Sequence, residues 1–186
     1  MLEAAQAVFL ERGYADANLD EIVARAGGSK RNVYTWFGGK EGLFEAVLHR
    51  LLESMLEATL PPIDPCADPR AWLLEIGRSI QHHILHAHHT SSLRRLIAAA
   101  ETRPELARRA YQRGPGALLE HVEEFLVAQT VAGAWAIERP RLAARAFVSL
   151  IRADRQIEWL LTGQTPEHLN EDDYVVWVVE HFLASF

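Results

Sequence analysis

The sequence predicts an all-α protein with two domains. Apolar residues make up 49% of its 186 residues and recur at helical spacing along the chain, with no run of strict alternation that would predict a strand. Glycine and proline clusters divide the chain into helix-length segments. These observations predict a three-helix N-terminal domain followed by a larger helical domain.

The first two predicted helices lie within the first 26 residues. Residues 1–12 form an amphipathic helix that ends at Gly13. The second helix begins at Asn18 with a capping-box pattern, in which Asn18 accepts the N3 amide and Glu21 reaches back to the cap. Gly27 then supplies a left-handed residue, which allows the chain to turn sharply.

The third predicted helix is short and has two contrasting sides. Ser29 is a favourable N-cap residue, and Gly38-Gly39 ends the helix about two turns later. At 100° per residue, Val33 and Phe37 share the inward side. The outward side carries Arg31, Asn32 and Thr35, flanked by Lys30 and Tyr34. Such side chains bind base edges and phosphates, although an ordinary solvated helix surface is the alternative interpretation.

The helix, the glycine turn and the second helix with a polar outer side together predict a helix-turn-helix, whose second helix enters the major groove of DNA. The local charge agrees, because residues 28–40 contain three basic residues and no acid. The whole chain has a net charge of −6, which argues against non-specific nucleic-acid binding by its entire surface. DNA contact is therefore expected at this one patch.

Residues 1–48 carry four markers of a known domain: Phe9…Gly13-Tyr14, Ile22…Ala26-Gly27, Tyr34…Phe37 and Lys40-Glu41…Leu43-Phe44. This segment resembles, without gaps, the DNA-binding domain of the tetracycline-repressor (TetR) family. The resemblance implies a ligand-responsive regulator, usually a repressor, that binds a palindromic DNA operator as a homodimer. It implies base contacts from Lys30, Arg31, Asn32, Tyr34 and Thr35, and phosphate contacts from Asn18, Tyr34, Trp36 and Lys40. Gly28 departs from the family, which usually has an apolar residue there, so a looser turn is expected.

A fourth predicted helix begins at about residue 40 and is too long and too broadly apolar for the small domain alone. We therefore predict a DNA-binding domain over residues 1–46 and an effector-binding and dimerisation domain over residues 47–186, with this helix serving both. A tilt of the helix would carry a signal between the domains.

The proline-rich segment Pro61–Pro69 interrupts the helical pattern. Beyond it, helices are predicted at about 70–88, 91–101, 104–112, 115–135, 139–162 and 171–185. The segment from Leu93 onward also resembles, more weakly, the C-terminal domain of one TetR-family branch.

Helices 115–135 and 139–162 are predicted to form an antiparallel pair with apolar faces. Two copies of this pair, one from each subunit, would complete a four-helix bundle, which is how TetR-family dimers usually form. The alternative is that these faces only complete the core of the monomer.

An effector pocket is predicted in the larger domain, for a small and largely apolar molecule, because this region holds several tryptophans. Its candidate lining residues are Trp72, Ile76, His83, His121, Phe125 and Asp154. Asp154 falls on an otherwise apolar helical stripe, so we expect a buried carboxylate. Pairing with an arginine such as Arg152 or Arg155, or with a residue of the second subunit, is favoured over a ligand contact.

Residues 81–89 contain five histidines, of which His82, His86 and His89 are spaced i, i+4, i+7. Three imidazoles on one helix side are a candidate zinc or nickel site. No fourth ligand or supporting carboxylate is evident, so a polar surface near a pocket mouth is preferred. A metal-responsive regulator remains an alternative.

Catalysis is not expected, because the chain lacks inward Glu-x-x-His repeats, a nucleophile-His-Asp pattern and a phosphate-binding loop. No cofactor is predicted. A helical protein-interaction adaptor that does not bind DNA is a further alternative. The single cysteine excludes an internal disulfide, and neither a signal segment nor a membrane-length apolar run is visible. A cytoplasmic protein without membrane contact is therefore expected.

Overall fold

A computed structural model describes residues 1–84, 93–94, 97, 100, 104–164 and 171–185, except for the side chains of residues 52, 53, 55–59, 83, 84 and 171. The described residues form helices and connecting turns, which confirms the predicted all-α fold. No helix among them is both long and apolar enough to cross a lipid bilayer. Two compact units are present: Met1–Ser54 with the described part of Ser91–Gly114, and Met55–Thr90 with Pro115–Phe186.

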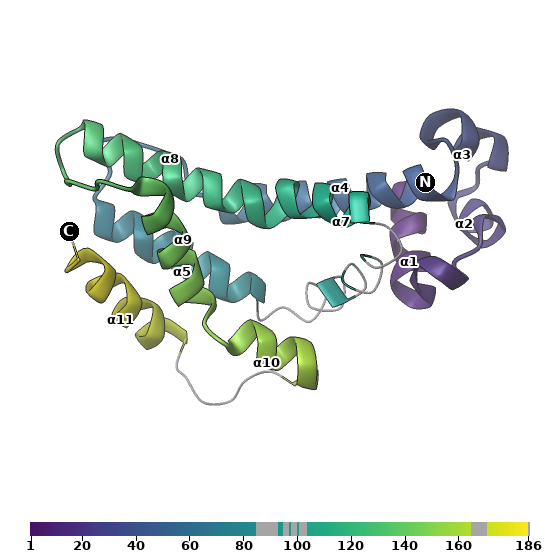
Figure 1. Cartoon of the computed structure of the whole chain (residues 1–186). Coiled ribbons are helices and arrows are strands. Elements are labelled where there is room, and N and C mark those ends of the chain that lie inside the picture. Colours follow the sequence, from purple (N-terminus) through teal and green to yellow (C-terminus); the bar gives the residue numbers. More distant parts are fainter. Residues whose placement is uncertain (85–92, 95–96, 98–99, 101–103, 165–170, 186) are drawn as a thin grey trace. The chain divides into compact units, whose positions relative to one another are not determined.

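The first unit contains α1 (Leu2–Asp16), α2 (Leu19–Ala26), α3 (Lys30–Phe37), the first part of α4 (Lys40–Thr59) and α7 (Pro104–Tyr111). Figure 1 shows α1, α2 and α3 grouped around the start of α4. Their shared apolar core includes Val8, Phe9, Ile22, Val33, Leu43 and Phe44. Leu106 of α7 belongs to this core as well, although the sequence analysis places residue 106 in the larger domain.

The local signals for helix ends are confirmed for α2 and α3, whereas α1 continues past the predicted end at Gly13 to Asp16. Gly13 interrupts α1 with φ 76°, and Gly27 ends α2 in the left-handed region with φ 66°. The reciprocal capping box is wrong in detail. Asn18 Oδ1 accepts the N–H of Asp20 at 2.9 Å, and the Glu21 carboxylate binds the Arg25 guanidinium at 2.6 Å instead of the cap. The Glu21 carboxylate would form a charge-assisted bond in either position, but with the Arg25 guanidinium both partners carry a charge, and the charges are opposite.

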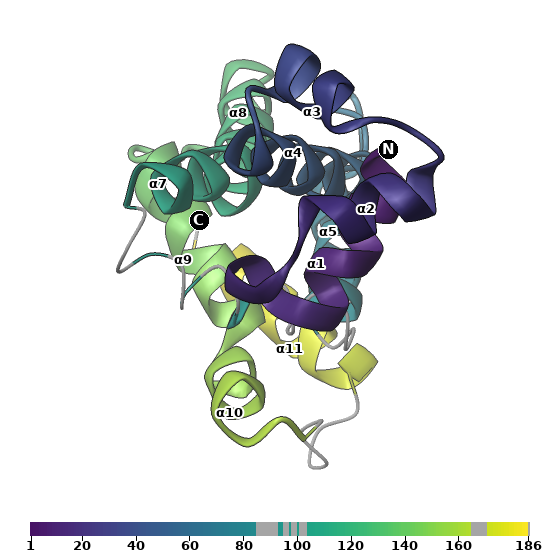
Figure 2. The same cartoon turned by 90° about the vertical axis from the view of Figure 1, so that its right-hand side faces the viewer.

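The second unit contains α5 (Pro69–Ile84), α8 (Ala117–Val131), α9 (Pro140–Arg152), α10 (Arg155–Thr162) and α11 (Glu171–Leu183). In Figures 1 and 2, α9 lies between α8 and α11, and α5 packs against both α9 and α11. The core of this unit includes Leu73, Ile76, Phe125, Phe147 and Val178.

Gly77 marks the close approach of three helices in this unit. A Cβ atom added to Gly77 would lie 2.8 Å from Val175 Cγ1 of α11 and 3.1 Å from Ile151 Cδ1 of α9. Both distances are shorter than ordinary van der Waals contact. The absence of a side chain therefore lets α5 pack closely on both neighbours.

The predicted helix 139–162 is wrong, because it is divided into α9 and α10. Ala153 lies between them with φ 46° and ψ −152°, which is not helical. The turn moves Asp154 off the apolar stripe, so its side chain is exposed and the expected buried carboxylate is wrong. The buried charge here is that of Arg155, which is 3% exposed.

The predicted break at Gly114-Pro115-Gly116 is also wrong. A π-helical turn, η1 (Gln112–Gly116), connects α7 to α8 and contains Pro115. Proline lacks the N–H that an α-helix needs and its ring crowds the preceding turn. The wider π turn accommodates both defects without ending the helical path.

Candidate nucleic-acid interface

Helix α3 is held at both ends and along one side. The Ser29 hydroxyl Oγ accepts the N–H of Asn32 at 3.2 Å, and Gly38, with φ 73°, donates its N–H to the Tyr34 carbonyl at 3.0 Å. Val33 is fully buried in the core of the first unit. The two caps and this buried side chain fix the rotation of α3, and hence which residues face outward.

The outward side of α3 is polar but also carries two large aromatic rings. Arg31 and Thr35 are exposed and Asn32 is half-buried. Tyr34 is 61% exposed and Trp36 is 64% exposed. Two exposed aromatic side chains on one short helix are unfavourable in water and are typical of a surface that binds a partner.

The two cations at the start of α3 differ in their partners. Lys30 Nζ lies 2.8 Å from Asp20 Oδ1, so this lysine is partly neutralised by α2. Arg31 forms no hydrogen bond or ion pair with any described residue. Arg31 is therefore the more available cation for a base or a phosphate.

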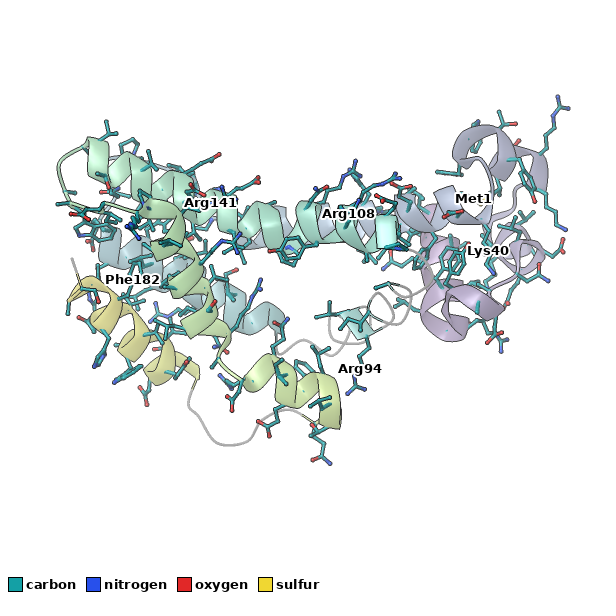
Figure 3. All side chains as sticks on the ribbon, viewed as in Figure 1. Met1, Lys40, Arg94, Arg108, Arg141 and Phe182 are labelled. Atoms are coloured by element: carbon teal, nitrogen blue, oxygen red, sulfur yellow. The ribbon has the colours of Figure 1, made fainter. Side chains whose placement is uncertain are left out.

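Lys40, labelled in Figure 3, connects the start of α4 to the end of α1. Its Nζ donates to the Ala15 carbonyl at 2.9 Å and lies 4.8 Å from the centre of the Tyr14 ring. The predicted phosphate contact of Lys40 stays a prediction. In the structure Lys40 also holds the start of α4 against the end of α1. The sequence did not indicate this contact, because Ala15 is 25 residues away.

The space beside Gly28 is occupied. A Cβ atom at Gly28 would lie 2.7 Å from Cε of Met1, the residue labelled at the N-terminus in Figure 3. The Met1 methyl group thus takes the place of the apolar side chain that the sequence resemblance expects at position 28. The turn before α3 is packed at this point.

An ion-pair cluster fastens α1 to α2. The Arg25 guanidinium donates to both carboxylate oxygens of Glu11, at 2.8 and 2.7 Å, and also to Glu21. The hydrogen bond from Arg25 lowers the pKa of the Glu11 carboxyl, more strongly than desolvation raises it. The sequence did not indicate this contact, because Glu11 and Arg25 lie on different helices.

An open cavity of about 630 Å³ lies beside α3, within the first unit. It is lined by Leu2, Trp36, Phe37, Gly42, Glu45, Ala46, His49, Arg50 and Arg113. Two ion pairs involve this lining: Arg109 with Glu45 at 2.6 Å, and Arg50 with Glu3 at 3.1 Å. The sequence did not indicate this cavity, because its tryptophans predict a pocket in the larger domain.

Four of the predicted effector-pocket residues come together in the second unit. The rings of Trp72 and Phe125 stack with centroids 3.7 Å apart, and His121 stacks on Trp72 at 5.8 Å. Ile76 is fully buried in the same core. Asp154 is exposed, and the side chain of His83 lies outside the described residues.

The polar atoms of this aromatic cluster are bonded to the proline-rich loop. Trp72 Nε1 donates to the Pro62 carbonyl at 3.0 Å, and His121 Nε2 lies 2.8 Å from the Pro61 carbonyl. His121 therefore has a partner, as the sequence analysis expects of a core histidine.

The proposed metal site cannot be assembled from the described residues. His82 is exposed on α5, while His86 and His89 lie outside the part of the chain that the structure describes. Within that part, no three metal-ligating side chains are grouped. The histidine site stays a prediction.

Both parts of the chain match families of transcriptional regulators. Residues 1–47 match the family described as bacterial regulatory proteins, tetR family. Residues 71–186 match the AefR-like transcriptional repressor, C-terminal domain. The solved structure of the flavonoid-responsive regulator FrrA superposes with a TM-score of 0.86 and 27% identity, covering 99% of this chain and 93% of that one.

Two curated relatives match shorter segments. The chain is 36% identical over 87 residues to the HTH-type transcriptional repressor SCO4008 of Streptomyces coelicolor, covering 46% of this chain and 42% of that protein. It is 39% identical over 70 residues to the HTH-type transcriptional activator FasR of Mycolicibacterium smegmatis, covering 38% and 32%. These matches span less than half of either relative.

Proposed function

Because this chain belongs to the TetR family of bacterial transcriptional regulators, we propose that it is a homodimeric repressor released from its DNA operator by a small effector. The operator is expected to be a palindrome, read by the α3 helices of two subunits. The observation that carries the proposal is the outward side of α3, where Arg31 is unpaired among the described residues and Tyr34 and Trp36 are exposed.

The chemistry of α3 fits DNA in two ways. A guanidinium such as that of Arg31 can bind guanine through two hydrogen bonds, which gives base preference. The resemblance implies phosphate contacts, which orient a protein on DNA without reading its sequence, from Asn18, Tyr34, Trp36 and Lys40. Two α3 helices in one dimer would reach successive major grooves, about 34 Å or a multiple apart.

A second copy of the chain is the proposed partner of α9 and α11. On α9, Leu142 and Leu150 are 54% and 43% exposed, and Ala146 between them is exposed as well. Trp177 of α11 is 53% exposed. The opposite side of α9 is already buried in the monomer core. We propose that this exposed stripe forms the dimer contact, in place of the predicted pair that includes 115–135.

The aromatic cluster of Trp72, His121 and Phe125 is the proposed effector site. Stacked rings can open to admit another flat ring without leaving polar groups unpaired, because Trp72 and His121 bond to the proline-rich loop. The flavonoid response in the name of FrrA supports an effector of aromatic type. Release of DNA then requires that the effector bind the non-DNA-binding state more tightly.

The test is selection of DNA fragments by the purified protein from random and source-genome pools, followed by affinity measurements across a salt series. A palindromic site, a steep salt slope and one or two dimers per site are the expected results. A reporter driven by that site should be repressed. Failure to enrich any DNA sequence would contradict operator binding. Activation of the reporter would leave operator binding intact but would mean that the protein is an activator and not a repressor.

A further inference from the structure

Three helices of the second unit meet at a buried polar centre. Arg155, the first residue of α10, is 3% exposed, and its Nη1 donates to Gln81 Oε1 of α5 at 2.8 Å. Gln81 is 1% exposed and donates its own Nε2 to the carbonyl of Ile151, near the end of α9. We call these three groups the Arg155 centre.

The Arg155 centre has a positive charge but no carboxylate among the described residues. Asp154 is adjacent in sequence but exposed, and no ion pair joins it to Arg155 in the described chain. Asp172 is bound to Arg78 at 2.5 Å. Arg155 Nε is buried and has no hydrogen-bond partner in the described part of the molecule.

This arrangement is incomplete in physical terms. An arginine side chain cannot lose its proton in a protein, so burial does not neutralise it. A buried charge is normally balanced by an opposite charge, and the neutral amide of Gln81 supplies only one hydrogen bond. The second acceptor expected by Nε is absent from the described residues. The centre therefore lacks one anionic acceptor.

We propose that the Arg155 centre binds the carboxylate of a small organic acid, and that this acid is a second effector, bound apart from the aromatic cluster of Trp72, His121 and Phe125. The second clause rests on the proposed function, whereas the first does not. A planar carboxylate matches the edge of the guanidinium that carries Nε and can form two parallel hydrogen bonds with it. Trp159 follows Arg155 by one helical turn and is 5% exposed, so the apolar body of the acid would lie on the Trp159 side of α10.

The charge of Arg155 also reaches α11. Burial raises the pKa of the Tyr174 hydroxyl, the positive charge of Arg155 opposes that rise, and the negative charge of Asp154 adds to it. The Tyr174 hydroxyl donates to the Leu150 carbonyl at 2.5 Å. Binding of a carboxylate at Arg155 would therefore be sensed by α5, α9, α10 and α11 together.

The first experiment supplies the missing anionic acceptor by substitution of a neighbouring residue. Gln81→Glu places a carboxylate at the atom that now accepts from Arg155. Gln129→Glu is the matched control, because Gln129 is also 1% exposed but its side-chain amide donates to the carbonyls of Asp64 and Pro65 instead of facing an arginine. We expect Gln81→Glu to raise the thermal unfolding midpoint and Gln129→Glu to lower it. Equal lowering by both substitutions would overturn the proposal.

The second experiment measures acid binding directly. The thermal midpoint is recorded with benzoate, 2-naphthoate and decanoate, and with the corresponding amides, at constant ionic strength. At least one acid should raise the midpoint of the unsubstituted chain more than its amide does. Gln81→Glu should weaken the binding of that acid at least tenfold, because the new carboxylate already pairs with Arg155. An acid and its amide acting equally throughout the panel overturns the carboxylate assignment.

A further substitution removes the charge while keeping the length of the side chain. Arg155→Met should leave the midpoint of the ligand-free protein unchanged or higher, and should abolish the effect of the acid. An acid that raises the midpoint of Arg155→Met as much as that of the unsubstituted chain would overturn the proposal, whatever the ligand-free midpoint, because loss of the bond to Gln81 also affects the latter. These midpoint measurements need no DNA, so they test acid binding independently of whether the protein binds an operator. An acid that binds but does not release the operator overturns only the effector assignment.

Discussion

Arg31 and Lys30 are neighbours on α3, yet the structure gives them different surroundings. Lys30 is bound to Asp20 at 2.8 Å, whereas Arg31 is exposed and unpaired among the described residues. Side chains that must lose a partner before binding DNA gain less from the contact. Base reading is therefore expected to depend more on Arg31 than on Lys30.

Arg31→Ala is predicted to reduce operator affinity by about 1–3 kcal/mol and to relax base preference at one position of each half-site. Affinities for the operator and for single-base variants, measured at one salt concentration, test this. Arg108→Ala is the control, because Arg108 is also exposed but is paired with Glu105 on α7. An equal loss on every DNA sequence would remove Arg31 from the base-reading residues.

Lys40→Ala is predicted to weaken all DNA sequences alike and to reduce the salt slope by about one. It should also lower the thermal midpoint, because the bond from Nζ to the Ala15 carbonyl is lost. Binding across a salt series and thermal unfolding separate the two effects. A lower midpoint with an unchanged salt slope would leave Lys40 with a structural role only.

Glu11 gives a prediction for acid. Its pKa is lowered by Arg25, so its contribution to stability is present above the ordinary pKa of a glutamate and is lost as the pH falls through the lowered value. The midpoint of Glu11→Gln should therefore lie below that of the unsubstituted chain at pH 7. The difference should shrink towards pH 3. A difference that is constant with pH would contradict this assignment.

At the scale of elements, the helix ends that local chemistry determines could be predicted from the sequence. Gly27, Ser29 and Gly38 act on their immediate neighbours, so α2 and α3 have the expected bounds. The break at Ala153 could not be predicted, because a positive φ in an alanine has no sequence signal and the apolar spacing continues past it. Pro115 predicts a helix break, but the chain passes through this residue as a π turn.

The close packing at Gly77 sets a limit on the size of that residue. Gly77→Leu is predicted to destabilise the fold by about 1–3 kcal/mol, because the new side chain would displace Val175 and Ile151. Chemical denaturation measures the change. Gly77→Ala is the graded control, because it adds only the Cβ atom that lies close to Val175 and Ile151, so it should cost less than leucine. If Gly77→Leu is no more destabilising than this control, the packing interpretation fails.

At the scale of the whole molecule, the family of the protein and the position of α3 could be predicted from residues 1–48, where motif spacing is local. The aromatic cluster was anticipated in part, because Trp72 and Phe125 are large and apolar. The pairing of Gln81 with Arg155 spans 74 residues, and no local pattern indicates which distant residues meet. Tertiary contacts of this kind require the structure.

The apolar stripe on α9 gives the prediction for assembly. The double substitution Leu142→Glu with Leu150→Glu is predicted to yield monomers and to weaken operator binding by about 10²–10⁴-fold, because each half-site would then bind alone. Light scattering after size-exclusion chromatography measures the mass. Val131→Glu on α8, where Val131 is 83% exposed, is the control and should have the same mass in solution as the unsubstituted protein. A dimer that survives the double substitution would require another interface.

The same stripe has a consequence for gene dosage. If a lone subunit leaves Leu142, Leu150 and Trp177 in water, mass action makes the amount of active protein rise more steeply than its synthesis at low copy number. Newly made subunits would also be the form most open to proteases until they meet a partner. A cell with a single copy of the gene would then pass sharply, rather than gradually, from an unoccupied operator to an occupied one.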